Sequence, residues 1–319
     1  MSGHDTLVVA RGPALAGDAV RGLEDFLASW CAGQGGLAPI ARHVLAVPGK
    51  RLRGRLTLAC AALGQDDASA SADAVRAAAA VELLHEASLV HDDVCDRSVL
   101  RRGAPSVAAV FGMRVAVRFG IWLAARSLAL IGELETRLGL GLAIAPLVAL
   151  AEGQLLETVA CGSGVTERRA HYLAVVRAKT GALMRMACDI GARVAGAASR
   201  EREALATFAD AFGTAFQIFD DIRDLEAPAS LGKPGGSDLA NGVWTWPVLE
   251  WLGDHSDAEA RAVVDLPLDA LRAELIASGA LRRARGFAAA ELARARSALA
   301  EVSDGPARAW LLELAEVGA

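Results

Sequence analysis

Residues Glu86–Asp96 read EASLVHDDVCD and place Asp92, Asp93 and Asp96 at the end of an apolar stretch with helical periodicity. Asp92 and Asp96 stand four residues apart, so they lie on one face of the predicted helix, with Asp93 about 100° round. Carboxylates at this spacing repel one another and also meet the negative end of the helix dipole. A divalent cation would offset that repulsion, and Mg²⁺ typically takes one or two carboxylates plus substrate phosphate oxygens. A solvated acidic helix end is the alternative interpretation of a single such motif.

The same pattern occurs a second time. Phe216–Leu225 reads FQIFDDIRDL and repeats the spacing with Asp220, Asp221 and Asp224, again after an apolar run. Two such clusters, each ending a helix with a buried pattern, could face each other across a cavity. Together they would hold a cluster of Mg²⁺ ions on a diphosphate. The doubled motif therefore favours metal-dependent diphosphate chemistry over an ordinary acidic surface.

The composition predicts an all-α protein. Of its 319 residues 53% are hydrophobic, only 5% are aromatic, and 10 are proline, while Ala and Leu abound. This usage favours helices throughout. We find no linker and no repeat beyond the two aspartate helices, so we predict one all-helical domain over residues 1–319, with residues 1–15 poorly ordered. The net charge of −5, without a basic stripe, argues against nucleic acid as a partner.

The cysteines and the N-terminus predict a cytoplasmic protein. The five scattered cysteines form no CxxC pair, which is typical of reduced thiols rather than of a disulfide framework or a zinc site. The N-terminal residues lack a basic region followed by a long apolar core, so we expect no signal peptide. The longest apolar run, residues 138–151, is too short to span a membrane and contains Pro146.

A basic segment precedes the first aspartate motif. Gly49–Leu56 reads GKRLRGRL and places Lys50, Arg51 and Arg53 at a predicted helix start, where positive charge opposes the helix dipole. A bound anion would remove this penalty, because a helix start with Lys and Arg is suited to phosphate. A solvated basic turn is the alternative interpretation.

A loop with paired arginines follows the first motif. It reads RRGAP from Arg101 to Pro105, and arginines on a loop beside carboxylates suit bidentate phosphate binding. Ser71 is the expected N-cap of the helix that leads to the first motif. Lys179-Thr180-Gly181 interrupts the helical pattern. The other helices are expected at about residues 18–31, 37–47, 107–131, 140–159, 166–176, 182–198 and 200–224.

These elements, in this order, resemble the trans-isoprenyl (polyprenyl) diphosphate synthase family, in particular geranylgeranyl diphosphate synthases. The matching motifs are GKRLR, HxxxLVHDDxxD, RRGxP, KTG, FQIxDDxxD and GKPxGxDL, between Gly49 and about Pro247. The resemblance implies a helical bundle around a deep central cavity, usually as a homodimer. It also implies head-to-tail prenyl transfer, in which isopentenyl diphosphate adds to an allylic diphosphate.

The resemblance also implies roles for the matched residues. Three aspartates would ligate three Mg²⁺ ions, with the remaining motif aspartates in support: Asp92, Asp96 and Asp220, supported by Asp93, Asp221 and Asp224. Three basic residues would clamp the allylic diphosphate, namely Arg101, Lys179 and Lys233. The isopentenyl diphosphate would be bound by Lys50, Arg53, His85 and Arg102. The reacting centre would be lined by Thr180 and Gln217.

The chain departs from the family pattern at three positions. Val243 in GVWTWP stands where the family commonly has a phosphate-binding lysine, which should weaken allylic binding. Gly120-Ile121 replaces the usual Gly-Asp pair. Phe119 stands just before it, where a small residue is common. These departures affect substrate preference more than reaction class.

The residues before the first motif bear on product length. Ala87 and Ser88 are small, where family members that stop at fifteen carbons commonly place an aromatic, so we predict a longer product. The substrate tail is expected to run along the helix that bears Asp92, in a tunnel that Ala87 and Ser88 flank near its start. Phe119, with Trp122 at i+3, could close this tunnel about two helical turns further from the metals. We therefore predict a twenty-carbon product, geranylgeranyl diphosphate. The alternative is that Phe119 is an ordinary core residue and the tunnel ends elsewhere.

Two other functions use related features. A terpene cyclase or diphosphate lyase on the same scaffold would ionise a prenyl diphosphate but needs no second diphosphate site. The retained Lys50, Arg53, His85 and Arg102 argue against it. A non-catalytic subunit of a heteromeric synthase could discard its carboxylates, and both aspartate clusters are intact here.

Overall fold

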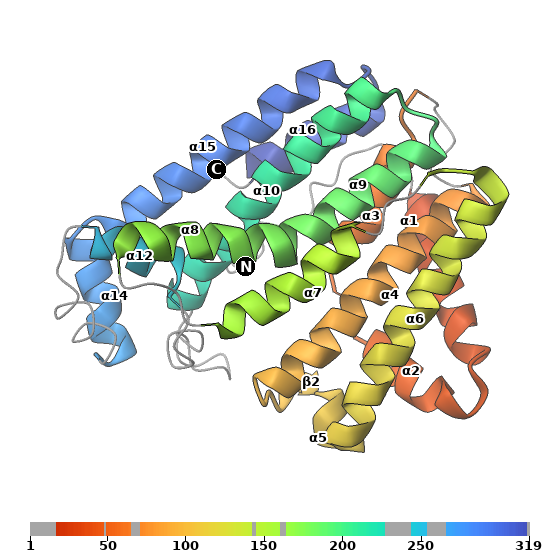
Figure 1. Ribbon diagram of the computed structural model, residues 1–319, viewed down its shortest axis with the longest axis horizontal. Coiled ribbons are helices and arrows are strands. Elements are labelled where there is room, and N and C mark those ends of the chain that lie inside the picture. Colours follow the sequence, from red (N-terminus) through yellow and green to blue (C-terminus); the bar gives the residue numbers. More distant parts are fainter. Residues whose placement is uncertain are drawn as a thin grey trace. The chain divides into compact units, whose positions relative to one another are not determined.

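The computed structural model describes residues 17–47, 49–64, 71–141, 145–159, 164–226, 244–253 and 266–317. Lys233, Val243, the GKPGGSDL motif and residues 1–15 lie outside these ranges. The described chain is helical apart from a two-stranded hairpin, which confirms the predicted all-α class (Figure 1). It divides into two compact units, each described by itself below. The expectation of one domain around a deep central cavity stays a prediction.

The first unit comprises Met1–Ala143, Leu183–Ala206 and Leu299–Leu314. Its helices and strands are α1 Gly17–Ala32, η1 Gly35–Leu37, α2 Ala38–Leu45, α3 Leu52–Ala61, α4 Ala72–Cys95, β1 Leu100–Arg101, β2 Ala104–Pro105, α5 Val107–Phe111, α6 Met113–Leu138, α9 Ala182–Val194, η5 Leu299–Glu301, and parts of α10 Ser199–Glu226 and α16 Pro306–Val317.

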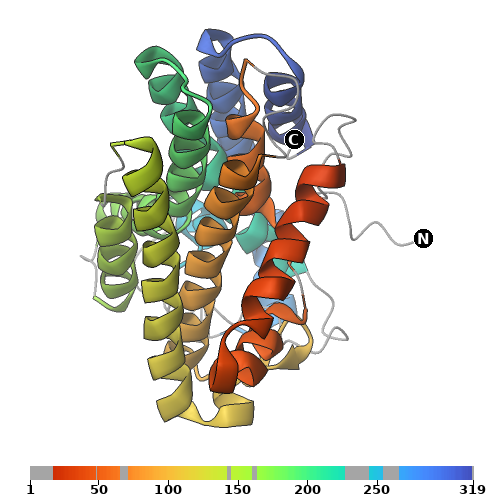
Figure 2. The same cartoon turned by 90° about the vertical axis from the view of Figure 1, so that its right-hand side faces the viewer.

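Helix α4 is the centre of the first unit and runs between α1 and α6 (Figure 2). The Ser71 side chain accepts a hydrogen bond from the backbone N–H of Ala74, which confirms the predicted N-cap. A run of fully buried alanines, Ala77–Ala80, lets neighbouring helices approach α4 closely. The buried Ser127 hydroxyl of α6 donates to the Ala80 carbonyl at 2.6 Å. The end of α4 that carries the first aspartate motif is therefore fixed by packing along its length.

The expected continuous helix over residues 107–131 is wrong. Gly112 adopts φ +87° and separates the short α5 from α6, which then continues to Leu138. Glycine takes this positive φ without the steric penalty that other residues suffer. The helix expected to reach residue 198 also ends earlier, at Val194, where Gly196 with φ +70° follows.

The RRGAP segment forms a small hairpin. Strands β1 and β2 pair antiparallel, with Leu100 opposite Pro105 and Arg101 opposite Ala104. Arg102 and Gly103 have φ of +52° and +78°, as the two central residues of a type I′ turn do. The sequence predicted only a loop here, because an arginine is not a usual residue for a left-handed turn position.

The second unit comprises Ile144–Ala182, Thr207–Ala298 and Ala315–Ala319. It contains the rest of α10 and α16, together with α7 Ala145–Thr158, α8 Val165–Val176, a π-helical turn η3 Arg177–Gly181, α12 Trp246–Leu252, α14 Leu268–Ala277 and α15 Ala280–Ala298. The π-helical turn confirms the predicted interruption at Lys179-Thr180-Gly181. Such turns recur at functional sites.

Glycine makes a close contact possible beside this turn. A Cβ on Gly153 of α7 would lie 2.7 Å from the Cβ of Ala178, so only glycine fits without a shift. The turn and α7 therefore pack backbone to backbone.

Among the described helices α6 is the one whose length and apolar composition would suit a membrane span. Its Phe119, Leu123 and Leu134 are buried within the first unit.

Candidate active site

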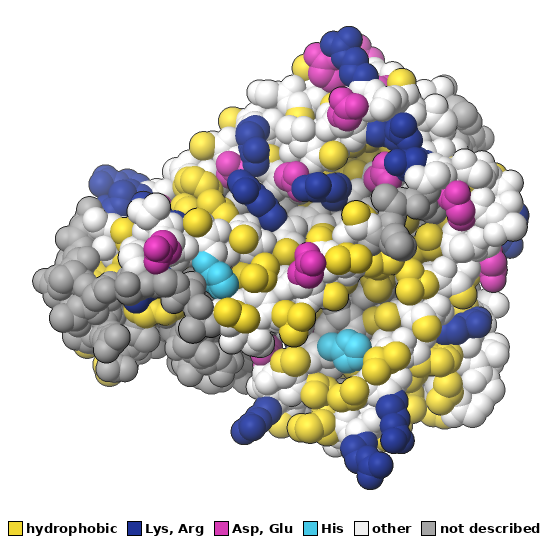
Figure 3. Space-filling view, viewed as in Figure 1, with side chains coloured by type: hydrophobic (Ala, Val, Ile, Leu, Met, Phe, Trp, Pro, Cys, Tyr) yellow, Lys and Arg dark blue, Asp and Glu magenta, His cyan; other side chains and the backbone are white. Residues whose placement is uncertain are grey.

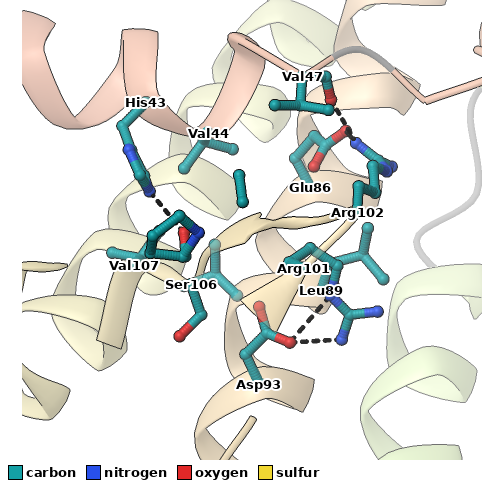
Figure 4. Close-up of a pocket in the computed structure, with 13 residues that line it drawn as sticks. His43, Val44, Val47, Glu86, Leu89, Asp93, Arg101, Arg102, Ser106 and Val107 are labelled. Carbon is teal, nitrogen blue, oxygen red and sulfur yellow. Dashed lines mark hydrogen bonds and ion pairs between the residues drawn. The ribbon is translucent and has the colours of Figure 1, made fainter. Parts of the chain in front are cut away.

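The first aspartate motif ends α4 with three carboxylates in different environments. Asp92 is partly buried, Asp96 is exposed at the C-cap, and Asp93 is buried. One carboxylate oxygen of Asp93 accepts two hydrogen bonds from Arg101, from Nε at 2.9 Å and Nη2 at 2.5 Å (Figure 4). The middle carboxylate is thus bound to the hairpin, whereas the outer two lie closer to solvent.

The next arginine of the hairpin, Arg102, is bound to another carboxylate on the same face of α4. Arg102 Nη1 donates to Glu86 Oε1 at 2.9 Å and to the Val47 carbonyl at 3.2 Å. Glu86 and Asp93 stand two helical turns apart, so each arginine of the hairpin meets its own carboxylate. Figure 4 shows both pairs at the rim of a small cavity of about 40 Å³ between α2, α4 and the hairpin. The structure brings the predicted phosphate ligands Arg101 and Arg102 to the first motif.

Arg53 and His85 form the adjacent part of the site. Arg53 Nη1 lies 3.0 Å from His85 Nε2, so the guanidinium donates and the imidazole accepts. Burial, and then the positive charges of Arg53, Arg102, Arg101 and Arg51, hold the pKa of His85 well below its usual value. His85 is therefore neutral near pH 7, with its proton on Nδ1. In the described part of the chain, His85 Nδ1 and Arg53 Nε are buried donors without a hydrogen-bond partner.

In the sequence, Arg51 stands with Lys50 and Arg53 at a predicted anion-binding helix start, but its side chain has a different environment. It is 4% exposed and pairs with three carboxylates, those of Glu24 at 2.9 Å, Glu86 at 3.3 Å and Glu82 at 3.5 Å. Its backbone is left-handed, with φ +49°. Arg51 therefore has a structural role and is not available to bind a substrate anion.

Glu82 supplies the negative charge that the basic helix start needs. Its Oε1 accepts the backbone N–H of Gly54, in the first turn of α3, at 2.7 Å. A carboxylate at this place satisfies an orphan N–H and interacts favourably with the helix dipole. Sequence reasoning missed Glu24, Glu82 and Glu86. Glu82 and Glu86, two glutamates in a helix with an otherwise mostly apolar pattern, were the available signal.

The second unit brings Thr180, Gln217 and Asp221 into one hydrogen-bonded chain. The Thr180 hydroxyl donates to Gln217 Oε1 at 3.0 Å, and Gln217 Nε2 donates to Asp221 Oδ1 at 3.1 Å. The other oxygen of Asp221 accepts from the Tyr172 hydroxyl at 2.5 Å and from the backbone N–H of Trp246 at 3.2 Å. Asp221 is therefore buried and bound, like Asp93 in the first motif.

Asp220 and Lys179 are further predicted site residues of the second unit. Asp220 is exposed, and Lys179 Nζ forms an ion pair with Glu157 at 2.5 Å. Sequence reasoning assigned no role to Tyr172, Trp246 or Glu157. Tyr172 is the one tyrosine of the sequence, which was a signal that the composition offered.

The donor set fits a hard divalent cation. The carboxylates of both motifs are hard oxygen ligands, which suit Mg²⁺ better than softer metals. Within the described ranges no three His, Cys, Asp or Glu side chains are grouped to hold a metal by themselves.

Of the residues predicted to limit product length, Ala87 and Phe119 lie in one buried cluster, and the partly buried Trp122 packs against it. Phe119 and Ala87 are 3% and 2% exposed and belong to the same core of the first unit. The centroid of the Trp122 ring lies 5.2 Å from that of Phe119 and 5.7 Å from that of Trp30 in α1. The Ser88 hydroxyl donates to the His85 carbonyl at 2.7 Å. Sequence reasoning missed Trp30.

Comparisons with known proteins identify the family. A family model described as polyprenyl synthetase matches residues 35–268. A nonaprenyl diphosphate synthase of Mycobacterium tuberculosis is 35% identical over 86% of this chain and 83% of its own length. A heptaprenyl diphosphate synthase component 2 of Geobacillus stearothermophilus is 38% identical over 72% of this chain and 71% of its own. A geranylgeranyl pyrophosphate synthase of Geoglobus acetivorans is 31% identical over 88% and 89%.

A solved structure agrees with these relatives. The polyprenyl synthase of Caulobacter crescentus, crystallised in complex with calcium and isoprenyl diphosphate, matches with a TM-score of 0.84 and 31% identity. The match covers 98% of this chain and 96% of that one. The chain is a member of the polyprenyl synthetase family and a prenyltransferase of the trans-prenyl diphosphate synthase type.

Proposed function

We propose that this chain catalyses Mg²⁺-dependent head-to-tail condensation of isopentenyl diphosphate with an allylic prenyl diphosphate, and that the product is geranylgeranyl diphosphate. The observation that carries the two-substrate reaction is the Arg53–His85 pair. Two buried donors, Arg53 Nε and His85 Nδ1, have no partner in the described part of the chain. A diphosphate oxygen is an acceptor that would satisfy both. A lyase, which handles one diphosphate, has no use for this second site.

The reaction places charge where the proposed ligands stand. Departure of the allylic diphosphate breaks a C–O bond, which leaves a delocalised cation and concentrates negative charge on the leaving group. Arg101 and Lys179 would stabilise this charge electrostatically, with Lys233 as the third predicted clamp. Bound Mg²⁺ would supply Lewis-acid stabilisation of the same charge. The double bond of isopentenyl diphosphate then attacks the allylic carbon, and the released diphosphate accepts the proton that leaves the new chain.

The predicted metal ligands are the outer carboxylates of the motifs. Asp92, Asp96 and Asp220 would hold three Mg²⁺ ions, while Asp93 and Asp221 are bound by protein donors. The calcium complex of the Caulobacter crescentus relative supports the use of a divalent cation. The proposal requires both motifs to act on one diphosphate, and this arrangement stays a prediction.

Purified protein should decide between synthase, lyase and inactive subunit. Incubation with Mg²⁺, an allylic diphosphate and radiolabelled isopentenyl diphosphate should give a longer prenyl diphosphate. The matched control omits isopentenyl diphosphate and should release little hydrocarbon or alcohol. Product in the control would indicate a lyase. No turnover by the chain alone, with turnover restored by a partner chain, would indicate a subunit of a heteromeric synthase.

A twenty-carbon product is supported by the ring cluster of Phe119, Trp122 and Trp30. Packed rings resist insertion of a further five-carbon unit at a cost of about 1–3 kcal/mol. The relatives carry names from geranylgeranyl to nonaprenyl, so a longer product is the competing outcome. Mass spectrometry of the Phe119→Ala product should show longer chains. Phe26→Ala, which removes a partly buried ring from the same cluster, is the control. An unchanged product distribution in Phe119→Ala would show that the tunnel ends elsewhere.

We also propose that the protein acts in the cytoplasm as a homodimer formed through α6. Val117, Ile121 and Leu128 are exposed on this helix at 37%, 59% and 41%. Their spacing places them on one apolar face, part of which Figure 3 shows. Light scattering should give twice the monomer mass, and Ile121→Asp should reduce it. A heteromer is the competing outcome, because one relative is named as a synthase component.

A further inference from the structure

A single buried carboxylate oxygen joins the hairpin to the interior of the first unit. Glu86 Oε1 accepts hydrogen bonds from Arg102 Nη1 at 2.9 Å and from Arg51 Nη1 at 3.3 Å. The side chains of Glu86 and Arg51 are 4% and 3% exposed, whereas 26% of the Arg102 side chain is exposed. One end of the Arg102 guanidinium is thus bound to a buried frame, while part of the side chain remains accessible.

Two further features hold Arg102 in this place. Its guanidinium also donates to the Val47 carbonyl at 3.2 Å. Gly49 leaves the space that the guanidinium occupies, since a Cβ there would lie 2.7 Å from Arg102 Nη2. The backbone of Arg102 is left-handed, with φ +52°, a conformation that is unfavourable for a non-glycine residue. The side-chain contacts of Arg102 therefore occur together with an unfavourable backbone conformation at the same residue.

Arg102 is held close to other cations. Its positive charge contributes to the lowered pKa values of both Arg53 and His85, although burial is the larger cause for each. Burial raises the pKa of Glu86, and the charge of Arg102 counteracts this rise. Arg51 already pairs with Glu24 and Glu82. Arg102 is accordingly the counter-ion that Glu86 needs, and Glu86 offsets the repulsion between Arg102 and Arg53.

We propose that Glu86 is a positioning residue for isopentenyl diphosphate, which holds Arg102 beside Arg53 and His85 before the diphosphate binds. This inference rests on the proposed function, because it takes these three groups as the diphosphate ligands. A cation set formed in advance saves the cost of ordering a long side chain during binding. Glu86 acts through Arg102 and does not itself contact the substrate.

Steady-state kinetics of Glu86→Gln test the proposal. The KM for isopentenyl diphosphate should rise about 3- to 10-fold, because the neutral amide oxygen binds Arg102 more weakly than the charged carboxylate does. The KM for the allylic substrate should stay within about twofold, because Arg101 remains bound to Asp93. Thermal unfolding measures any loss of stability. If Glu86→Gln fails to fold, Glu86→Asp replaces it, because the shorter side chain withdraws the acceptor but keeps the charge.

Two comparisons separate positioning from a structural role. Glu24→Gln removes a carboxylate from the same Arg51 cluster without touching Arg102, and should leave both KM values unchanged. In an Arg102→Ala background, Glu86→Gln should add nothing to the KM for isopentenyl diphosphate, because the residue through which it acts is gone. Additive effects, or equal effects on the two substrates, would overturn the proposal.

Gly49→Ala gives a test that leaves Glu86 in place. The added methyl would displace the flexible end of Arg102 rather than the backbone, so the KM for isopentenyl diphosphate should rise with little change in melting temperature. An unchanged KM in both Gly49→Ala and Glu86→Gln would refute the positioning role. Failure of the proposed function is distinguishable, because Arg102→Ala alone would then leave the KM for isopentenyl diphosphate unchanged.

Discussion

The two aspartate motifs share their spacing and a buried middle aspartate, but different donors bind that aspartate. In each motif the middle aspartate is buried, Asp93 at 4% and Asp221 at 3% exposure. Asp93 is held by one charged side chain, that of Arg101. Asp221 accepts hydrogen bonds from three neutral donors, the Tyr172 hydroxyl, the Gln217 amide and the Trp246 backbone N–H.

This difference shows that one sequence pattern can be built on two kinds of support. The ion pair to Arg101 makes the first motif depend on a short hairpin with a two-residue turn. This ion pair is weakened where the arginine is exposed to solvent. A set of neutral hydrogen bonds makes the second motif depend on the packing of α8, α10 and α12. In both, the pattern separates a middle carboxylate that fixes the helix end from outer carboxylates nearer to solvent.

The largest expected effect comes from removing an outer carboxylate of either motif. Asp92→Ala and Asp220→Ala should each lower kcat by at least about 10²-fold, because charge stabilisation at the leaving group is lost. Turnover assays at saturating Mg²⁺ measure this, and Zn²⁺ should be a poor replacement. Cys95→Ser, an exposed position inside the first motif, should keep the wild-type rate. A near-normal rate in either aspartate variant would end the metal assignment for that motif.

The next effect should distinguish the two proposed diphosphate sites, because each variant should change the KM of one substrate. Lys50→Ala or His85→Ala in the first unit should raise the KM for isopentenyl diphosphate by about 10-fold, the size of a lost charge-assisted hydrogen bond. Lys179→Ala in the second unit should instead raise the KM for the allylic substrate. Initial-rate kinetics with each substrate varied in turn give both values. Equal changes in the two KM values would show that the diphosphate sites are assigned wrongly.

A smaller effect should distinguish the supports of the two middle aspartates. Tyr172→Phe removes one hydrogen bond to Asp221 and should lower the free energy of unfolding by about 0.5–1.5 kcal/mol. High salt should not change this difference, because the lost donor is neutral. Asp93→Asn weakens an ion pair, so its cost should shrink as salt rises. Urea denaturation at low and high salt measures both variants. The same salt response in both would contradict the distinction.

The smallest expected effect concerns pH. The folded-state pKa of His85 is depressed, so folding favours the neutral imidazole. Its contribution is present above the unfolded pKa of about 6.5 and is lost as pH falls toward the folded value. The melting temperature of the wild type should therefore fall between pH 7 and pH 5 by more than that of His85→Gln. Equal slopes would mean that His85 is accessible to protons in the folded protein.

The sequence by itself determined the helical class, most helix positions and the family. These depend on local properties: alanine-rich periodicity, the Ser71 cap, and motifs that are contiguous in the chain. Even the break at Gly112 was readable in principle, because glycine is the residue that takes a positive φ at no cost.

Tertiary structure alone decided which charged groups are paired within the fold and which remain candidates for binding substrate. Arg51 and Arg53 stand two residues apart in one basic segment, yet Arg51 pairs with Glu24, 27 residues earlier, and Arg53 with His85, 32 residues later. Tyr172 reaches Asp221 across 49 residues. A local pattern specifies residue types, but burial and pairing depend on which distant helices pack together, and no local pattern contains that information.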